Sequence, residues 1–180
     1  MSLKRPEVVY YAAASLDGFI ATPDGSVEWL EPFEASGEDY GYAEFLASID
    51  ALVMGSRTYE QALTFGPWPY AEKPAVVLSG RSLPAVAPSV IVADAAPPDA
   101  VDLLAANEGV RRIWLVGGGA VAGAFQTAEL IDEYVVSIMP VLLGGGVGLL
   151  GGKGSMGRVL LTSSRTYADG VVQNAYRAAR

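Results

Sequence analysis

Three glycine-containing turns each follow a short apolar run in this sequence. GSRT (residues 55–58) follows ALVM, SGR (79–81) follows AVVL, and GGG (117–119) follows IWLV. If these runs are strands of a parallel sheet, the helix beginning after each strand offers free N–H groups, and glycine lets a phosphate approach the backbone. Two of the turns also carry an arginine, which can bind a phosphate through two parallel hydrogen bonds. Together the turns predict a dinucleotide site, although any one alone is explained as well by a strand that ends at glycine.

The triple glycine also matches the letters of the Rossmann motif, G-x-G-x-x-G/A, over residues 117–122. That motif requires an acidic residue about 20 positions later, where it binds the ribose. The corresponding stretch here is SIMPVLL, and several apolar runs precede the turn. The sequence therefore argues against a Rossmann site.

Composition excludes several other kinds of chemistry. The chain has neither Cys nor His, so thiol catalysis, Ser-His-Asp hydrolysis and His-ligated zinc are ruled out, and we expect no metal site. The net charge is −8 with twelve basic residues and no polybasic run, so we expect neither nucleic acid nor a membrane as partner. The start, MSLKRPEVVYY, lacks a secretory pattern, and no apolar run reaches membrane-spanning length. We therefore expect a cytoplasmic protein that acts on a small molecule.

The turns lie in a pattern of strands that alternate with helices. Strands are predicted over residues 8–14, 51–55, 74–80, 89–93, 112–119 and 134–143, the last an edge strand or bulged at its proline. Helices are predicted over residues 39–49 and 97–107, from residue 56, and over 120–130, with a glycine-rich loop over 144–157. Residues 158–178 predict a terminal hairpin turning at 168–170. This order indicates one α/β domain over residues 1–180, with a mostly parallel sheet and antiparallel strands at one edge.

Five segments resemble a known superfamily: SLDGFIA (15–21), ALVMGSRTYE (51–60), VVLSGR (76–81), WLVGGGAV (114–121) and IDEYVVSIMPVLLGGG (131–146). They are similar to the dihydrofolate reductase-like superfamily, and most closely to the RibD C-terminal family, the reductase domain of riboflavin biosynthesis. The resemblance covers nearly the whole chain. It implies a dihydrofolate reductase-like fold: a central mostly parallel mixed β-sheet, helices on both faces and an antiparallel C-terminal hairpin at one edge. It also implies NADPH as hydride donor and a homodimer, as is common among riboflavin-type relatives.

The same resemblance assigns the three turns to parts of NADPH. The turn at 55–58 would hold the cofactor's phosphates, the turn at 79–81 would receive the adenosine 2′-phosphate, and residues 117–121 would cover the pyrophosphate and nicotinamide. Both arginines could instead be exposed surface cations. The predicted cofactor-binding residues are Gly55, Ser56, Arg57, Thr58, Ser79, Gly80, Arg81, Gly117, Gly118, Gly119, Ala120 and Val121.

Three residues are candidates on the substrate side. Asp39 lies sixteen residues before the first glycine turn, as does the carboxylate that binds the pterin and assists protonation in dihydrofolate reductases; Glu38 and Glu44 are neighbouring alternatives. Trp29 resembles the tryptophan that precedes that carboxylate's helix and would bind substrate. Asp17, in SLDG, matches a motif beside the nicotinamide in riboflavin-type enzymes. The two aspartates have alternative roles, because Asp39 is as well placed to cap a helix and Asp17 to form an Asp-Gly turn.

A reductase is the function we expect from these residues. Hydride transfer is the cofactor's chemistry, so the protein supplies orientation and a proton, which without histidine must come from a carboxyl group of raised pKa, a tyrosine or water. We expect NADPH-dependent reduction of a pyrimidine or pteridine, most like that of 5-amino-6-(5-phosphoribosylamino)uracil reductase. A dihydrofolate reductase proper, a non-catalytic NADPH-binding sensor or partner module, and an α/β scaffold whose glycines bind nothing are the alternatives. A zinc-dependent deaminase domain is not expected, because Cys and His are missing.

Overall fold

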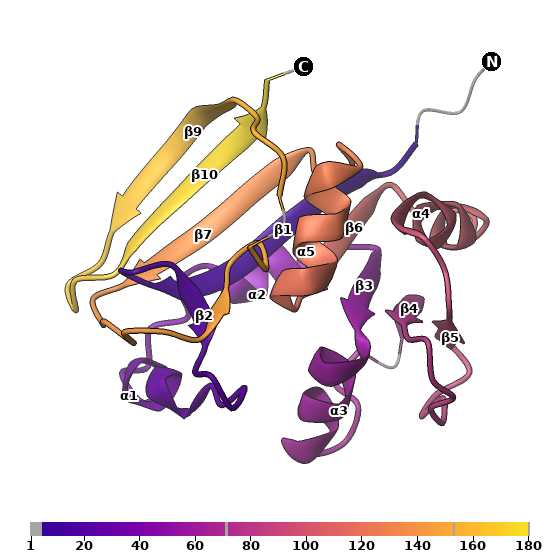
Figure 1. Cartoon of the computed structure of the whole chain (residues 1–180), viewed down its shortest axis with the longest axis horizontal. Coiled ribbons are helices and arrows are strands. Elements are labelled where there is room, and N and C mark those ends of the chain that lie inside the picture. Colours follow the sequence, from indigo (N-terminus) through magenta and orange to yellow (C-terminus); the bar gives the residue numbers. More distant parts are fainter. Residues whose placement is uncertain (1–4, 71, 153, 180) are drawn as a thin grey trace.

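One large β-sheet flanked by helices organises the computed structural model, which describes residues 5–70, 72–152 and 154–179 (Figure 1). Within these residues the sheet has eight strands in the order β5-β4-β3-β6-β1-β7-β10-β9. Neighbouring strands from β5 to β7 are all parallel, and β10 is antiparallel to both of its neighbours. The predicted mostly parallel sheet with an antiparallel hairpin at one edge is confirmed.

The parallel strands coincide with the apolar runs of the sequence. A parallel strand is covered on both faces and is therefore apolar along its length, and in β3 every side chain is buried. These strands are β1 (Glu7–Ser15), β3 (Ala51–Gly55), β4 (Ala75–Leu78), β5 (Val90–Ala93), β6 (Arg112–Gly117) and β7 (Glu133–Met139). The helices that follow β3, β5 and β6 are α3 (Ser56–Thr64), α4 (Pro97–Ala105) and α5 (Gly119–Thr127).

The antiparallel end of the sheet is the predicted terminal hairpin. It consists of β9 (Val159–Thr166) and β10 (Val172–Ala178). Because β10 pairs with β7, the edge strand is β9 and β7 is an inner strand. The prediction that the strand containing Pro140 lies at an edge or is bulged there is wrong. Proline has no N–H for a sheet ladder, so β7 ends at Met139, directly before it.

Helices cover both faces of the sheet, as predicted. On one face α4 and α5 close an apolar layer in which Phe125 of α5 is fully buried. On the other face α2 (Tyr42–Ala47) places Phe45 5.4 Å from the ring of Trp114, and α3 adds Tyr59 to the same layer. Figure 1 shows α4 and α5 in front of the sheet and α2 behind it. Each large apolar side chain buried in this way stabilises the fold by about 1.5–3 kcal/mol.

The segments after β1 and β7 contain short elements where neither a helix nor a strand was predicted. In the first, β2 (Phe19–Ala21) pairs with β8 (Val147–Gly148) of the glycine-rich segment. A 3-10 helix, η1 (Glu28–Leu30), and α1 (Glu31–Glu34) follow β2. The next helix, α2, begins later than predicted because residues 40 and 41 have φ of 53° and 78°, which a right-handed helix does not tolerate.

Among the described residues, none of the helices combines the length and apolar character needed to cross a membrane. The same residues contain no group of three or more metal-ligating side chains placed to hold an ion.

Candidate functional site

The three predicted turns lie side by side in the structure. They follow β4, β3 and β6, which are adjacent and parallel, so their carboxyl ends meet at one edge of the sheet. Gly55 is paired with Leu78, the residue before the second turn, and Gly117 is paired with Met54. Residues 55–58, 79–81 and 117–121 therefore lie together at this edge, although they are far apart in the sequence.

Two helix starts lie close together at this edge of the sheet. Gly55 and Gly118 precede α3 and α5 with extended backbone, and neither helix start has a side-chain cap. A Cβ atom on Gly55 would lie 2.9 Å from Val121 Cγ2, and one on Gly118 would lie 3.5 Å from Thr58 Oγ1. The first-turn N–H groups and the positive ends of both helix dipoles therefore point towards the same region, which suits an anion.

Two of the three consecutive glycines are required, each for a different reason. Gly117 has φ of +132°, a conformation that other residues rarely adopt. Gly119 is required by packing, because its Cβ would lie 2.2 Å from the carbonyl oxygen of Gly148. The segment containing β8 thus covers part of the start of α5, while Ala120 is exposed.

The turn after β4 borders a cavity of about 300 Å³. Ser79 fixes the turn, since its Oγ accepts the Arg81 N–H at 3.1 Å and donates to the Arg81 carbonyl oxygen at 2.7 Å. The Arg81 guanidinium donates to the carboxylate of Glu60 on α3, which raises the pKa of Arg81. Arg57 is exposed at the start of α3. The cavity is lined by Ser79, Gly80, Arg81, Ser82, Leu83, Val92 and Asp94.

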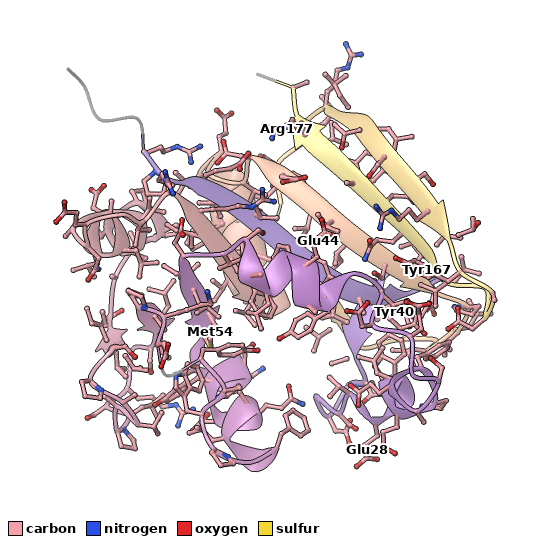
Figure 2. The ribbon with its side chains drawn as sticks, turned by 180° about the vertical axis from the view of Figure 1, so that it is seen from behind. Glu28, Tyr40, Glu44, Met54, Tyr167 and Arg177 are labelled. Atoms are coloured by element: carbon pink, nitrogen blue, oxygen red, sulfur yellow. The ribbon has the colours of Figure 1, made fainter. Side chains whose placement is uncertain are left out.

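A larger cavity, of about 510 Å³, lies on the face that α2 covers. Its floor comes from β1 and β7, and its walls come from the chain between η1 and the start of α2. Figure 2 shows this face, with α2 across the sheet and Tyr40 beside Tyr167, whose ring centroid is 5.0 Å away. The lining residues are Tyr11, Ala13, Leu30, Phe33, Glu34, Glu38, Asp39, Tyr40, Tyr42, Ser137 and Met139. We refer to it as the β1/β7 cavity.

The floor of the β1/β7 cavity is polar. Gln173 of β10 places Nε2 3.0 Å from Ser137 Oγ, 3.3 Å from Tyr11 Oη and 3.0 Å from the carbonyl oxygen of Tyr40. Burial raises the pKa of Tyr11 to about 12, although the hydrogen bond from Gln173 opposes the shift. Tyr11 therefore keeps its proton at neutral pH and presents a hydroxyl group at the cavity floor.

Asp39 binds backbone N–H groups at the beginning of α2. Its carboxylate accepts the N–H groups of Gly41 at 2.9 Å and Ala43 at 3.2 Å, at the beginning of α2. The same residue is exposed and lines the β1/β7 cavity. Glu38 also lines this cavity. The geometry thus fixes the carboxyl group of Asp39 at the cavity rim, where a substrate could reach it.

Asp17 lies outside the β1/β7 cavity and joins two loops. Its carboxylate accepts the Ser15 hydroxyl at 2.6 Å and the N–H groups of Leu143 at 3.1 Å and Gly144 at 2.7 Å. These bonds, the Ser15 hydroxyl first, hold the pKa of Asp17 below its usual value. Asp17 is therefore ionised at neutral pH, which suits a loop anchor better than a proton donor.

Trp29 belongs to η1 but does not line the β1/β7 cavity. Its indole nitrogen is buried and finds no acceptor among the described residues. The wall is made instead by Leu30 and Phe33, which follow it. Sequence reasoning missed these residues and the floor hydroxyl of Ser137, because no local pattern indicates which strand faces lie under residues 30–42.

The family model described as the RibD C-terminal domain matches residues 6–173, nearly the whole chain. The chain belongs to the RibD C-terminal family. Another RibD-type sequence, the riboflavin biosynthesis protein RibD of Mycobacterium tuberculosis (strain H37Rv), is 30% identical over 79% of this chain and 44% of its own length. The chain thus spans less than half of that protein. The "Uncharacterized protein YwjB" of Bacillus subtilis (strain 168) is 31% identical over 96% of this chain and 98% of its own length.

Solved structures agree with this RibD C-terminal assignment. A putative riboflavin biosynthesis protein from Shewanella sp. PV-4 has a TM-score of 0.83 and 31% identity, covering 97% of this chain and 99% of its own. The deaminase/5-amino-6-(5-phosphoribosylamino)uracil reductase of Thermotoga maritima has a TM-score of 0.73 at 17% identity and covers 97% of this chain and 57% of its own, a likeness of fold alone. The predicted dihydrofolate reductase-like fold is confirmed, and the chain is a RibD-type reductase-like domain.

Proposed function

We propose that this RibD-type domain is an NADPH-dependent oxidoreductase that reduces a small molecule of the pyrimidine or pteridine type. One observation carries the proposal. The three glycine turns end β4, β3 and β6, and the β1/β7 cavity lies beside the next two strands of the same row. Ligands of open α/β sheets bind beyond the carboxyl ends of parallel strands. The proposed dinucleotide site at this edge thus lies next to a cavity of substrate size, which occupies the α2 face and reaches Met139 at the end of β7.

The residues at the turns fit the phosphate groups of NADPH. The uncapped starts of α3 and α5 offer N–H groups, and the glycines before them let the two helix starts approach each other closely. Ser79 and Arg81 border a cavity of their own, and Arg57 is a second cation at this edge. We assign the pyrophosphate to the helix starts and the 2′-phosphate to the turn at residues 79–81. When bound, NADPH supplies a hydride.

The chain's own contribution to the reaction lies in the β1/β7 cavity. Phe33 and Tyr42 provide aromatic walls, and the Tyr11 hydroxyl, which donates to the Tyr40 carbonyl oxygen, lies at the floor. Asp39 holds its carboxyl group at the rim through the N–H bonds at the start of α2. From there it can pass a proton from solvent to the substrate, whereas Asp17 stands outside the cavity. The catalytic roles of Asp39 and Asp17 and the substrate contact of Trp29 stay predictions.

The test is a fluorescence titration with NADPH and with NADH, followed by NADPH oxidation at 340 nm with dihydrofolate and with an aminopyrimidine. We expect NADPH to bind at about 50 μM or below, within the usual range for enzyme ligands. Ser79→Ala and Arg81→Ala should weaken the binding of NADPH but not that of NADH, because only NADPH carries the 2′-phosphate. Absence of binding by both nucleotides at that concentration would contradict the proposal, and oxidation with dihydrofolate alone would favour a dihydrofolate reductase.

A further inference from the structure

We propose that the floor of the β1/β7 cavity binds the lactam edge of the substrate, a ring carbonyl next to a ring N–H, through Ser137 and Tyr11. The inference rests on the proposed function, in which this cavity is the substrate site. It goes beyond that function by naming the group that the protein recognises and the two side chains that select it.

The orientation of the Gln173 amide decides the polarity of the floor. Its Nε2 lies 3.0 Å from the carbonyl oxygen of Tyr40, and a carbonyl group can only accept a hydrogen bond. The amide therefore turns its NH₂ group towards the floor. The same nitrogen lies 3.0 Å from Ser137 Oγ and 3.3 Å from Tyr11 Oη. The two protons of the NH₂ group are best placed for the two nearer acceptors, Tyr40 and Ser137.

Ser137 keeps a proton that it can donate to a ligand. This residue of β7 is only 5% exposed and lines the cavity. Its oxygen accepts from Gln173, and its own proton meets no acceptor in the part of the chain that the structure describes. Because an unused buried donor costs stability, the hydroxyl suits an acceptor supplied by a ligand, such as a ring carbonyl oxygen.

Tyr11 has the opposite polarity. Its hydroxyl donates to the Tyr40 carbonyl oxygen at 3.3 Å, so its proton is already engaged. Burial raises the pKa of Tyr11 to about 12, so the group stays neutral at physiological pH. A phenolic oxygen can accept as well as donate. Tyr11 Oη therefore suits an N–H donor on a ligand.

The floor thus places a donor beside an acceptor, which is the complement of a lactam edge. Both hydroxyl oxygens lie close to the same Gln173 nitrogen, so one ring edge can contact both. Leu30, Phe33 and Tyr42 supply apolar walls for the faces of a flat ring. An amidinium edge, which presents only N–H donors, would leave the proton of Ser137 without an acceptor. The pattern therefore favours an oxopyrimidine or a pteridinone over a diaminopyrimidine.

The inference is tested with a matched pair of ligands, 5,6-diaminouracil and its 1,3-dimethyl derivative. Methylation replaces both ring N–H groups and leaves both carbonyl oxygens in place. Binding of each compound to the full chain is measured by calorimetry with NADP⁺ present. We expect diaminouracil to bind about tenfold more tightly, because the methylated ring leaves Tyr11 Oη without a donor. Equal binding of the two compounds, or binding of neither, would overturn the inference.

Two variants separate the two hydroxyl groups. Tyr11→Phe should reduce the preference to about threefold or less, because the N–H then has no acceptor and only the size of the methyl groups remains. Ser137→Ala should weaken both compounds about fivefold to tenfold and leave their ratio unchanged, because both carry the carbonyl oxygens. A full tenfold preference in Tyr11→Phe would overturn the inference.

Ser164→Ala is the matched control and should change neither affinity. Ser164 is exposed in β9 and pairs with Asn174, so its side chain lies on the opposite face of the sheet from Gln173. The ligand pair on the wild-type protein keeps the inference testable if a variant fails to fold. A tenfold preference in a protein that binds no NADPH would support the inference and contradict the proposed function. Equal binding of the pair with NADPH binding intact would overturn the inference alone.

Discussion

Gly55 sits where the two helix starts of the proposed cofactor site touch, so adding one methyl group tests their geometry. Its φ of −84° and ψ of 164° are open to any residue, so Gly55→Ala causes no backbone strain. The new Cβ would lie 2.9 Å from Val121 Cγ2, closer than van der Waals contact allows. Valine in a helix has one strongly preferred rotamer, so α5 or the side chain has to move. We expect the free energy of unfolding to fall by about 1–3 kcal/mol, the usual cost of overpacking.

A double-mutant cycle isolates this contact. Val121→Ala removes both γ-methyl groups of the valine, the opposing Cγ2 included, at a cost of about 1–2 kcal/mol. In the double variant the alanine at position 55 fills the space vacated, so we expect it to be more stable than the sum of the single effects by about 1–2 kcal/mol. Gly145→Ala is the control, because nothing lies within 4 Å of its Cβ.

The assay is urea unfolding of the five proteins, wild type included, followed by tryptophan fluorescence. The slope against urea should be unchanged, so that shifts of the midpoint report stability. NADPH affinity measured on the same proteins should fall in Gly55→Ala and recover in the double variant, because the helix starts return to their spacing. Additive effects of the two substitutions on stability would refute the close approach of α3 and α5.

Three further predictions concern the cofactor turn, the cavity floor and the sheet edge. Glu60→Gln should tighten NADPH binding about twofold to fivefold and leave NADH unchanged, because it frees Arg81 from its carboxylate partner; equal effects on both nucleotides would argue against a 2′-phosphate site there. The raised pKa of Tyr11 contributes stability that is fully present below pH 10 and is lost as pH rises towards 12. Urea midpoints measured from about pH 8 to 11 should therefore fall less steeply in Tyr11→Phe than in the wild type, and equal slopes would contradict the buried hydroxyl. We propose a homodimer through β9, an edge strand whose residues are all exposed, including Leu161 at 58%. Leu161→Lys should then shift the light-scattering mass towards the monomer's 18.8 kDa, whereas a monomeric wild type would contradict the dimer.

The parallel part of the fold could be read from the sequence because its signals are local. Strands such as β3 are continuous apolar runs that end at glycine, and the helix start follows at once. Once those strands are parallel, their carboxyl ends share an edge, so the grouping of the three turns follows from topology. The predicted role of Asp39 at the start of α2 is also local, since its partners Gly41 and Ala43 are two and four residues away.

Features that depend on distant partners could not be predicted in this way. The polar floor forms because β10 returns beside β7, which places Gln173 opposite Ser137. Asp17 is held by amides 126 and 127 residues later in the chain. The inner position of β7 likewise depends on where the C-terminal hairpin pairs, and a proline alone suggested an edge.

The central claim is that NADPH binds across the three glycine turns, and amide hydrogen exchange with and without NADPH tests it most directly. The account predicts slower exchange at residues 55–58, 79–81 and 117–121, where N–H groups would contact phosphates. The exposed strand β9 should exchange at the same rate in both conditions. Protection confined to other segments, or no change with NADPH at saturating concentration, would contradict the account.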